Sequence, residues 1–273
     1  MSNEQDPFVQ FKAMQREAWD GFGANEGFTT LPAAALVNFA SVAPGERVLD
    51  VGCGTGVVAV TAARRGAQAF GLDLTPRLLE RAKENARVAR VEVDFREGDA
   101  EKLPFEDGSF DVVLSQLGHI FAPRPDVATA ELLRVLKPRG RVAFTVWPPE
   151  HETGRLFMLL GKYMPQPPAG APVPAPPVAW GIPDTIRTRL GESVADLRFK
   201  RGFMIAPALS PEHVAAQLEA TFGPLQKLVA GLAAHPEKLA TLRSEMLSLI
   251  KDGFVADANE MRQHFLMACA VKR

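Results

Sequence analysis

The stretch Arg47–Gly56 constrains the fold of this chain more than any other. It begins with an apolar run that ends at Asp50-Val51, as a buried β-strand would, and continues with glycine at every second position, Gly52, Gly54 and Gly56. Glycine allows positive φ and leaves no Cβ atom in the path of a ligand. Small apolar residues then continue with helical spacing. Strand, glycine turn and helix together are typical of a nucleotide-binding site.

Two common nucleotide-binding turns do not fit this stretch. A P-loop requires Lys-Ser or Lys-Thr after its last glycine, and neither follows here. The dinucleotide pattern Gly-x-Gly-x-x-Gly/Ala would place its last small residue where Val57 stands. The remaining pattern, Asp-x-Gly-x-Gly-x-Gly over residues 50–56, resembles motif I of the class I S-adenosylmethionine (SAM)-dependent methyltransferases. The alternative is a glycine-rich turn that binds no ligand.

A second apolar run, Ala69–Leu74, carries the acid Asp73 near its end. Thr75 and Pro76 predict the start of a helix, with threonine as the N-cap and proline at the first helical position. Asp73 is therefore expected at the carboxyl end of the second strand, where an acid can accept hydrogen bonds from both ribose hydroxyls. Since Thr75 is available to cap the helix, we expect Asp73 to be free for the ligand.

A third acid follows a predicted strand at Val91–Phe95, in the segment Gly98-Asp99-Ala100. In the methyltransferases that this chain resembles, the acid of this segment meets the adenine amino group. The resemblance implies that Asp99 does so here and that Ala100 packs beside the ring. An acid and a backbone N–H suit adenine because its amino group donates and its ring nitrogen accepts. Asp99 alone would be interpreted as a solvated turn acid, but three acids after three apolar runs favour the cofactor.

Strands alternate with helices through the rest of the chain, which predicts a Rossmann-like α/β fold. Its sheet is expected to have seven strands, mostly parallel, with helices on both faces and an antiparallel last strand. A helix between the fourth and fifth strands is expected to be capped by Asp126 and to end at Lys137–Gly140. The strands expected after the third are Phe110–Ser115, Arg141–Trp147, Asp196–Ile205 and Arg262–Val271.

The resemblance extends over about residues 45–147 and is to the methyltransferase type 11 group, close in pattern to the ubiquinone/menaquinone C-methyltransferases. We expect one domain over residues 1–273, in which 1–44 form a helical cover, 45–147 the SAM-binding core and 148–273 an elaboration on the substrate side. In related enzymes such a cover closes over the cofactor, and we expect Trp19 or Phe22 to line the site.

The segment after residue 148 contains a proline-dense stretch and two long apolar helices. Residues 165–177 are expected to be extended, either as a connector or as a mobile edge of the substrate pocket. Helices are predicted near 155–164, 211–230 and 236–252. The apolar stripe from Leu218 to Leu232 would form core, cover an apolar substrate or make a dimer contact.

Composition excludes several classes of protein. A net charge of −1 over 273 residues offers no electrostatic footprint for nucleic acid. No apolar run approaches the length of a membrane span, and the polar start is not a signal peptide. Two cysteines indicate a cytoplasmic chain without disulfides. The five histidines lie far apart in the sequence, so no metal site is expected. A monomer and a homodimer are both compatible with the sequence.

These observations predict a methyltransferase that acts on a small, apolar or aromatic acceptor. The acceptor pocket should open beyond the fourth strand, where His119 is the best-placed titratable group and is either a general base or a structural loop residue. An NAD(P)-dependent oxidoreductase and a non-catalytic SAM-binding protein are the alternatives. The residues expected to hold SAM are Trp19, Asp50, Gly52, Cys53, Gly54, Gly56, Asp73, Leu74, Asp99, Ala100, Ser115 and Gln116.

Overall fold

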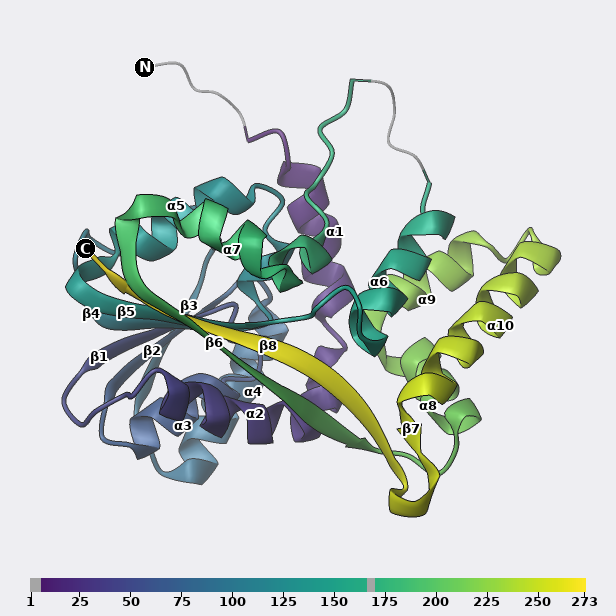
Figure 1. Ribbon diagram of the computed structural model, residues 1–273, viewed down its shortest axis with the longest axis horizontal. Helices are drawn as coiled ribbons and strands as arrows, with labels where there is room; N and C mark the ends of the chain where they lie inside the picture. Colours follow the sequence, from purple (N-terminus) through teal and green to yellow (C-terminus); the bar gives the residue numbers. More distant parts are fainter. Residues whose placement is uncertain (1–5, 166–169) are drawn as a thin grey trace.

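One mixed sheet organises the structure (Figure 1). The computed structural model describes residues 6–165 and 170–273. The strands are β1 (Arg47–Val51), β2 (Gln68–Asp73), β3 (Val93–Glu97), β4 (Phe110–Gln116), β5 (Leu136–Val146), β6 (Val194–Pro207), β7 (Phe254–Val255) and β8 (Glu260–Lys272). The helices are α1 (Val9–Trp19), α2 (Glu26–Phe39), α3 (Val57–Arg64), α4 (Pro76–Ala89), α5 (Pro125–Arg134), α6 (Glu152–Tyr163), α7 (Pro183–Leu190), α8 (Pro211–Thr221), α9 (Gly223–Gly231) and α10 (Pro236–Gly253).

The strand order confirms the predicted Rossmann-like sheet. Across the sheet the order is β3-β2-β1-β4-β5-β8-β6; β1 to β5 are parallel, and β8 runs antiparallel to β5 and β6. The sheet has one strand more than predicted, because the two-residue β7 also pairs with β8. The order reverses between β1 and β4, and ligands of such sheets bind beyond the carboxyl ends of the strands at this point.

Helices cover both faces of the sheet, and a helical lobe stands at one end of it. In Figure 1, α2, α3 and α4 lie below the sheet, α5 and α7 lie above it, and α8 to α10 form the lobe to which β6 and β8 extend. The buried core of the sheet includes Leu49, Phe110 and Phe144. A second apolar cluster, which includes Leu225 and Met246, lies among α6 and the helices of the lobe.

The helix predicted between the fourth and fifth strands ends earlier than expected. The helix before β5 stops at Arg134, so Lys137–Gly140 belongs to β5 and not to a helix end. Leu136 already pairs with Phe110, and an irregularity in the ladder accommodates the residues that follow. The predicted cap Asp126 lies inside the first turn, because Pro125 takes the first helical position.

The helix predicted at 211–230 is two helices, with a break at Phe222. Proline cannot continue the hydrogen bonding of a helix interior, and Pro224 therefore stands near the start of α9. Gly223 allows α9 to approach α1, since a Cβ atom there would lie 1.7 Å from the carbonyl oxygen of Ala18. This contact ties the N-terminal helix to the helical lobe.

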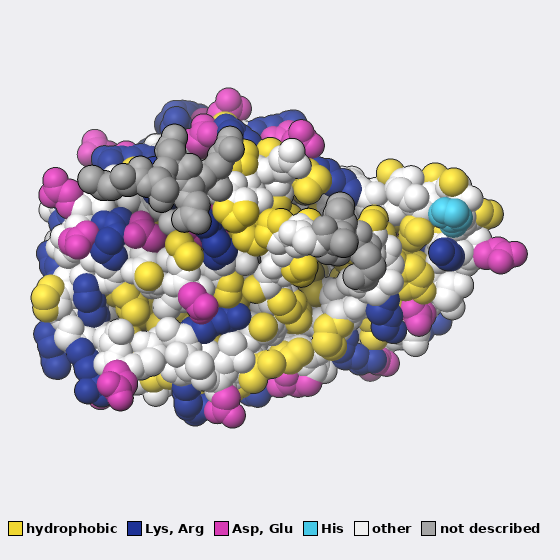
Figure 2. Space-filling model, turned by 90° about the horizontal axis from the view of Figure 1, so that it is seen from above, with side chains coloured by type: hydrophobic (Ala, Val, Ile, Leu, Met, Phe, Trp, Pro, Cys, Tyr) yellow, Lys and Arg dark blue, Asp and Glu magenta, His cyan; other side chains and the backbone are white. Residues whose placement is uncertain are grey.

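The outer surface carries apolar side chains on one side. Figure 2, seen from above, shows hydrophobic side chains gathered on the face where α1, α6 and residues 170–176 lie in Figure 1. Of the predicted extended stretch 165–177, residues 166–169 lie outside the described residues, and 171–176 have no helix or strand. Within the described ranges, no helix is long and apolar enough to cross a membrane.

Candidate functional site

The glycine turn after β1 meets the loop after β4 at the point where the strand order reverses. Gly52 has φ +67°, and a Cβ atom there would lie 2.6 Å from the Cα atom of Gly118. The backbone N–H groups of Gly52 and Cys53 donate to the carbonyl of Leu72 at 2.8 and 3.0 Å. Only glycine fits both this backbone conformation and this close approach. The turn is thus fixed by its two neighbouring strands.

A cavity of about 270 Å³ opens beside this turn. It lies close to the lower end of the volume range of small-molecule sites. The predicted cofactor residues that line it are Trp19, Asp50, Gly52, Cys53, Gly54, Asp73, Leu74, Asp99, Ala100 and Gln116. The structure thus brings together residues that are up to 97 positions apart in the sequence, from Trp19 to Gln116.

Two predicted cofactor residues lie behind the cavity wall. Gly56 backs onto β3, where a Cβ atom would lie 2.8 Å from the ring of Phe95. The Ser115 hydroxyl donates to the carbonyl of Val51 at 2.6 Å and accepts from the backbone N–H of His119 at 3.0 Å. Both residues therefore shape the turn and do not line the cavity.

The predicted base His119 does not reach the cavity. Its side chain is fully buried, with ring centroids 4.7 Å from Phe144 and 4.6 Å from Trp180. Neither ring nitrogen has a hydrogen-bond partner among the described residues. Burial, with the nearby Arg189 charge, lowers the pKa of His119 to about 3. The structure therefore places His119 in the core, behind the residues that line the cavity.

Asp50 and Asp73 are buried acids on the cavity wall. Burial raises the pKa of Asp50 to about 8; its Oδ2 accepts from the N–H of Ala59 at 3.2 Å, and its Oδ1 has no partner among the described residues. Asp73 was expected to be free, but it accepts from the N–H groups of Gly54 and Thr75, each at 2.8 Å. A carboxylate oxygen has two lone pairs, so both Asp73 oxygens keep room for ribose hydroxyls.

Asp99 is held by a residue that the sequence did not single out. Its Oδ2 accepts from the Lys12 ammonium at 2.6 Å, and its Oδ1 accepts from the N–H of Glu101 at 2.8 Å. Lys12 lies on α1, is itself buried and lines the cavity. Helical spacing places Lys12 on the buried face of α1, together with Phe8, Gln15 and Trp19. This spacing was the signal in the sequence that could have identified Lys12.

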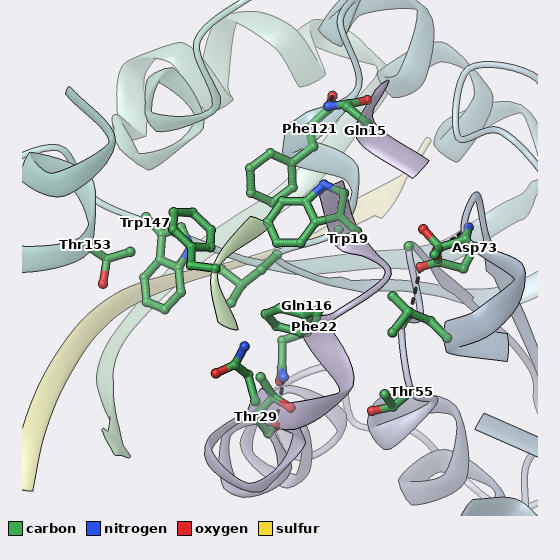
Figure 3. A pocket seen from close by; sticks show the side chains of 18 of the residues that line it. Gln15, Trp19, Phe22, Thr29, Thr55, Asp73, Gln116, Phe121, Trp147 and Thr153 are labelled. Carbon is green, nitrogen blue, oxygen red and sulfur yellow. Dashed lines mark hydrogen bonds between the residues drawn. The ribbon is translucent and has the colours of Figure 1, made fainter. Parts of the chain in front are cut away.

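The far end of the cavity is an apolar chamber. Figure 3 shows Asp73 and Thr55 on one side, Trp147 and Thr153 on the other, and Trp19, Phe22 and Gln116 between them. The apolar residues that line the chamber include one just after β5 and others on α6, α8, β8 and the α8–α9 junction: Trp147, Leu156, Phe157, Leu218, Phe222 and Met261. Leu218 and Phe222 belong to the apolar stripe that the sequence predicted from Leu218 to Leu232. The sequence alone could not place that stripe next to the cofactor end of the cavity.

Gln116 presents a hydrogen-bond acceptor in the cavity. Its Nε2 donates to the carbonyl oxygen of Thr29 at 2.8 Å, which can only accept, so the amide orientation is fixed. Its Oε1 is buried and has no partner among the described residues. A buried acceptor without a partner is costly. A ligand that donates a hydrogen bond would satisfy it.

The fold brings together two of the histidines that are distant in the sequence. His151, Glu152 and His264 offer ligand atoms within 4.8 Å of one another, although the two histidines lie far apart in the sequence. The Glu152 carboxylate lies 3.0 Å from Nδ1 of His264 and also lines the cavity. Arg201 approaches Nε2 of His151 at 3.3 Å. Of these three residues Glu152 lines the cavity, and His264 holds its carboxylate from behind.

The donor and acceptor pattern of the cavity fits SAM. SAM carries an ammonium, two ribose hydroxyls and an adenine amino group, all of which donate, and a positively charged sulfonium. The cavity offers acceptors at Asp50, Asp73, Asp99 and Gln116. The unpartnered Oδ1 of Asp50 suits the ammonium in particular.

Comparisons with known proteins agree with this chemistry. A family profile described as a methyltransferase domain matches residues 49–144. An uncharacterised protein of Mycobacterium tuberculosis is 37% identical over 218 residues, which are 80% of this chain and 78% of that protein. A ubiquinone biosynthesis O-methyltransferase of Xanthomonas oryzae pv. oryzae is 35% identical over 143 residues, 50% of this chain and 59% of that enzyme. The crystal structure of YcgJ from Bacillus subtilis has a TM-score of 0.57 at 20% identity and covers 88% of this chain and 98% of its own, and so it shares the fold.

Proposed function

We propose that this chain, which belongs to the class I SAM-dependent methyltransferases, transfers the methyl group of SAM to a small, largely apolar or aromatic molecule. One observation carries the proposal: a single cavity joins the glycine turn and its acids to an apolar chamber. The sulfonium of SAM activates the methyl group, so that transfer is an in-line displacement. The protein then contributes mainly by aligning the acceptor with the methyl group.

The ribose, adenine and ammonium groups of SAM would be held by Asp73, Asp99 and Asp50. Asp73 is the last residue of β2, Asp99 follows β3 and Asp50 stands in β1, so all three lie along the carboxyl edge of the sheet. Trp19 would close the cavity from the N-terminal side, where its ring lies 4.6 Å from that of Phe121. With SAM held in this way, its sulfonium would face Gln116 and the chamber.

The polar groups of the chamber narrow the class of acceptor. Gln116 Oε1 and the Glu152 carboxylate both accept hydrogen bonds, so the acceptor should carry a hydroxyl or N–H group on an apolar body. Burial would raise the pKa of Glu152, but hydrogen bonds from His264 and from backbone N–H groups, with the His264 charge, together outweigh burial and lower that pKa. Glu152 is therefore ionised at neutral pH. If the nucleophile is a protonated hydroxyl, Glu152 is the carboxylate placed to take its proton.

Calorimetric titration tests the choice of cofactor. We expect SAM and S-adenosylhomocysteine to bind and NAD⁺ and NADH to show no binding at the same concentrations. Binding of NAD⁺ without binding of SAM would support the oxidoreductase alternative and contradict the proposal.

A transfer assay with methyl-labelled SAM tests the acceptor class. Its panel pairs apolar phenols and aromatic amines with the corresponding compounds whose hydroxyl or N–H hydrogens are already replaced by methyl. We expect label to pass to donor-bearing compounds and not to their blocked partners. If SAM binds but no donor-bearing compound is labelled, the non-catalytic alternative is favoured.

A further inference from the structure

Lys12, which lines the cavity, lies among three carboxylates. The Nζ atom of Lys12 lies 2.6 Å from Asp6 Oδ2, 2.6 Å from Asp99 Oδ2 and 2.6 Å from Glu101 Oε2. The Lys12 side chain is only 10% exposed, and that of Glu101 is not exposed at all. Charges are buried in this way only where they are paired, because an unpaired buried charge is strongly destabilising.

The cluster fixes the acid expected to meet adenine from two sides. One oxygen of Asp99 is bound by Lys12, and the other by the backbone N–H of Glu101 at 2.8 Å. Both Lys12 and Asp99 line the cavity. Each oxygen of Asp99 keeps one lone pair, so the carboxylate is held in place and can still accept from a ligand.

Lys12 is also required for the electrostatic balance of the cluster. Asp6, Asp99 and Glu101 offer oxygens within 4.8 Å of one another. The other cation near them is Arg124, which lies 2.6 Å from Glu101 and 3.2 Å from Asp6. No pair between Arg124 and Asp99 is present within the described ranges. Without Lys12, the charge of Asp99 would face two other carboxylates with no cation of its own, and repulsion would move it.

We propose that Lys12 is a positioning residue for cofactor recognition, which holds the Asp99 carboxylate where it accepts the adenine amino group. The inference rests on the proposed placement of adenine at Asp99. It gives the N-terminal helix a part in choosing the base of the cofactor, because Lys12 belongs to α1 while Asp99 follows β3. Adenine recognition thus depends on one side chain of α1 as well as on the loop after β3.

The test measures base discrimination, which a merely structural lysine would not change. Hypoxanthine carries an oxygen where adenine carries its amino group, so a fixed carboxylate should reject S-inosylhomocysteine. The dissociation constants of S-adenosylhomocysteine and S-inosylhomocysteine are measured by calorimetry for the wild type, Lys12→Met and Arg16→Met. Arg16 is the matched control: it lies on the same helix and docks it through an ion pair with Glu97, without contact to Asp99.

We expect the wild type and Arg16→Met to prefer the adenine compound by about tenfold or more, the effect of one hydrogen bond to a charged group. Lys12→Met should weaken binding of the adenine compound by about tenfold and remove most of that preference. Lys12→Arg, which keeps the charge, should retain the preference. If Lys12→Met melts below the assay temperature, Lys12→Gln provides the same comparison.

A Lys12→Met protein that is folded and keeps the wild-type preference within twofold would overturn the inference and leave the proposed function intact. Equal loss of preference in Arg16→Met would also overturn it, since docking of α1 alone would then explain the effect. A wild type that binds neither compound would instead contradict the proposed function.

Discussion

At the scale of single residues, Asp50 has two parts: it is buried in the structure of the glycine turn, and it offers an acceptor oxygen to a ligand in the cavity. The residue is only 1% exposed, and one of its carboxyl oxygens has no hydrogen-bond partner in the described part of the chain. Burial disfavours the charged form, and the neighbouring Asp73 adds repulsion. A cationic ligand group beside Asp50 would favour the ionised form of its carboxyl group instead.

Binding of S-adenosylhomocysteine should therefore release a proton from the protein. With a pKa of about 8, Asp50 is mostly protonated at pH 7 in the free protein. The ligand ammonium lowers that pKa, and the carboxyl group ionises. Calorimetry at pH 7 in two buffers of different ionisation enthalpy should show release of close to one proton, and Asp50→Asn should abolish it. Release that persists unchanged in Asp50→Asn would contradict the assignment.

His119 should affect stability and not catalysis. Its pKa is about 3 in the folded protein against an ordinary value of 6.5, so only the unfolded chain takes up the proton between these values. The contribution of neutral His119 to the free energy of unfolding is thus fully present above pH 6.5. It is lost as the pH falls toward 3, by about 1.4 kcal/mol per pH unit.

Denaturant unfolding at pH 7 and pH 5 measures this contribution. Between those values the wild type should lose about 2 kcal/mol more unfolding free energy than His119→Phe does. The phenylalanine also removes two ring nitrogens that have no partner among the described residues. Methyl transfer by His119→Phe should stay close to that of the wild type. Loss of transfer in a folded variant would restore His119 as a base.

At the scale of elements, the glycine turn is under the strictest steric constraint at Gly52. Both Gly52 and Gly54 have positive φ, +67° and +53°. A Cβ atom on Gly52 would collide with the backbone of Gly118, whereas a Cβ atom on Gly54 meets nothing within 4 Å. Substitutions at these two positions therefore distinguish the cost of backbone strain, which both share, from the cost of a steric collision, which only Gly52 has.

Alanine substitutions at these two positions should therefore differ in cost. Gly54→Ala should lower the free energy of unfolding by about 1 kcal/mol, because only the left-handed backbone is strained. Gly52→Ala should lower it by about 2 kcal/mol or more and should also displace the loop after β4. Thermal melts and affinity for S-adenosylhomocysteine measure both. Equal effects of the two variants would show that the approach to Gly118 does not constrain the turn.

Local patterns predicted the elements well because their signals lie within a few residues. The apolar run before Asp50, and Thr75-Pro76 before α4, each identify a strand end or a helix start from neighbours alone. The helix end at Lys137–Gly140 was wrong because Pro138 and Gly140 have the same signature in a helix stop and in an irregular strand. Only pairing with β4 distinguishes the two, and pairing is not local.

At the scale of the whole molecule, the cavity is built from segments that lie far apart in the sequence. The cofactor end follows the order of β1, β2 and β3, so it could be predicted from motifs. The chamber end is assembled by α6, α8, β8 and the α8–α9 junction, and no sequence spacing relates them. The contact between Glu152 and His264 was missed for the same reason. Helical spacing could have placed Lys12 on the buried face of α1, but no sequence spacing relates it to Asp99.

Filling the chamber should impair methyl transfer and spare cofactor binding. Leu218 lines the cavity on α8, and the larger Leu218→Trp side chain would occupy space meant for the acceptor. Transfer to the compounds that the wild type methylates should fall about tenfold, with the dissociation constant of S-adenosylhomocysteine within twofold. Leu209→Trp, at a side chain that is 75% exposed, is the control and should change neither. Equal loss of cofactor binding in Leu218→Trp would contradict a separate acceptor chamber.

The crystal structure of the complex with S-adenosylhomocysteine tests the central claim most directly. We predict that the ribose hydroxyls lie within hydrogen-bond distance of Asp73 and the adenine amino group within that distance of Asp99. The sulfur should face the chamber between Gln116 and Trp147. Density for the ligand outside this cavity, or a sulfur directed away from Trp147 and Gln116, would contradict the account.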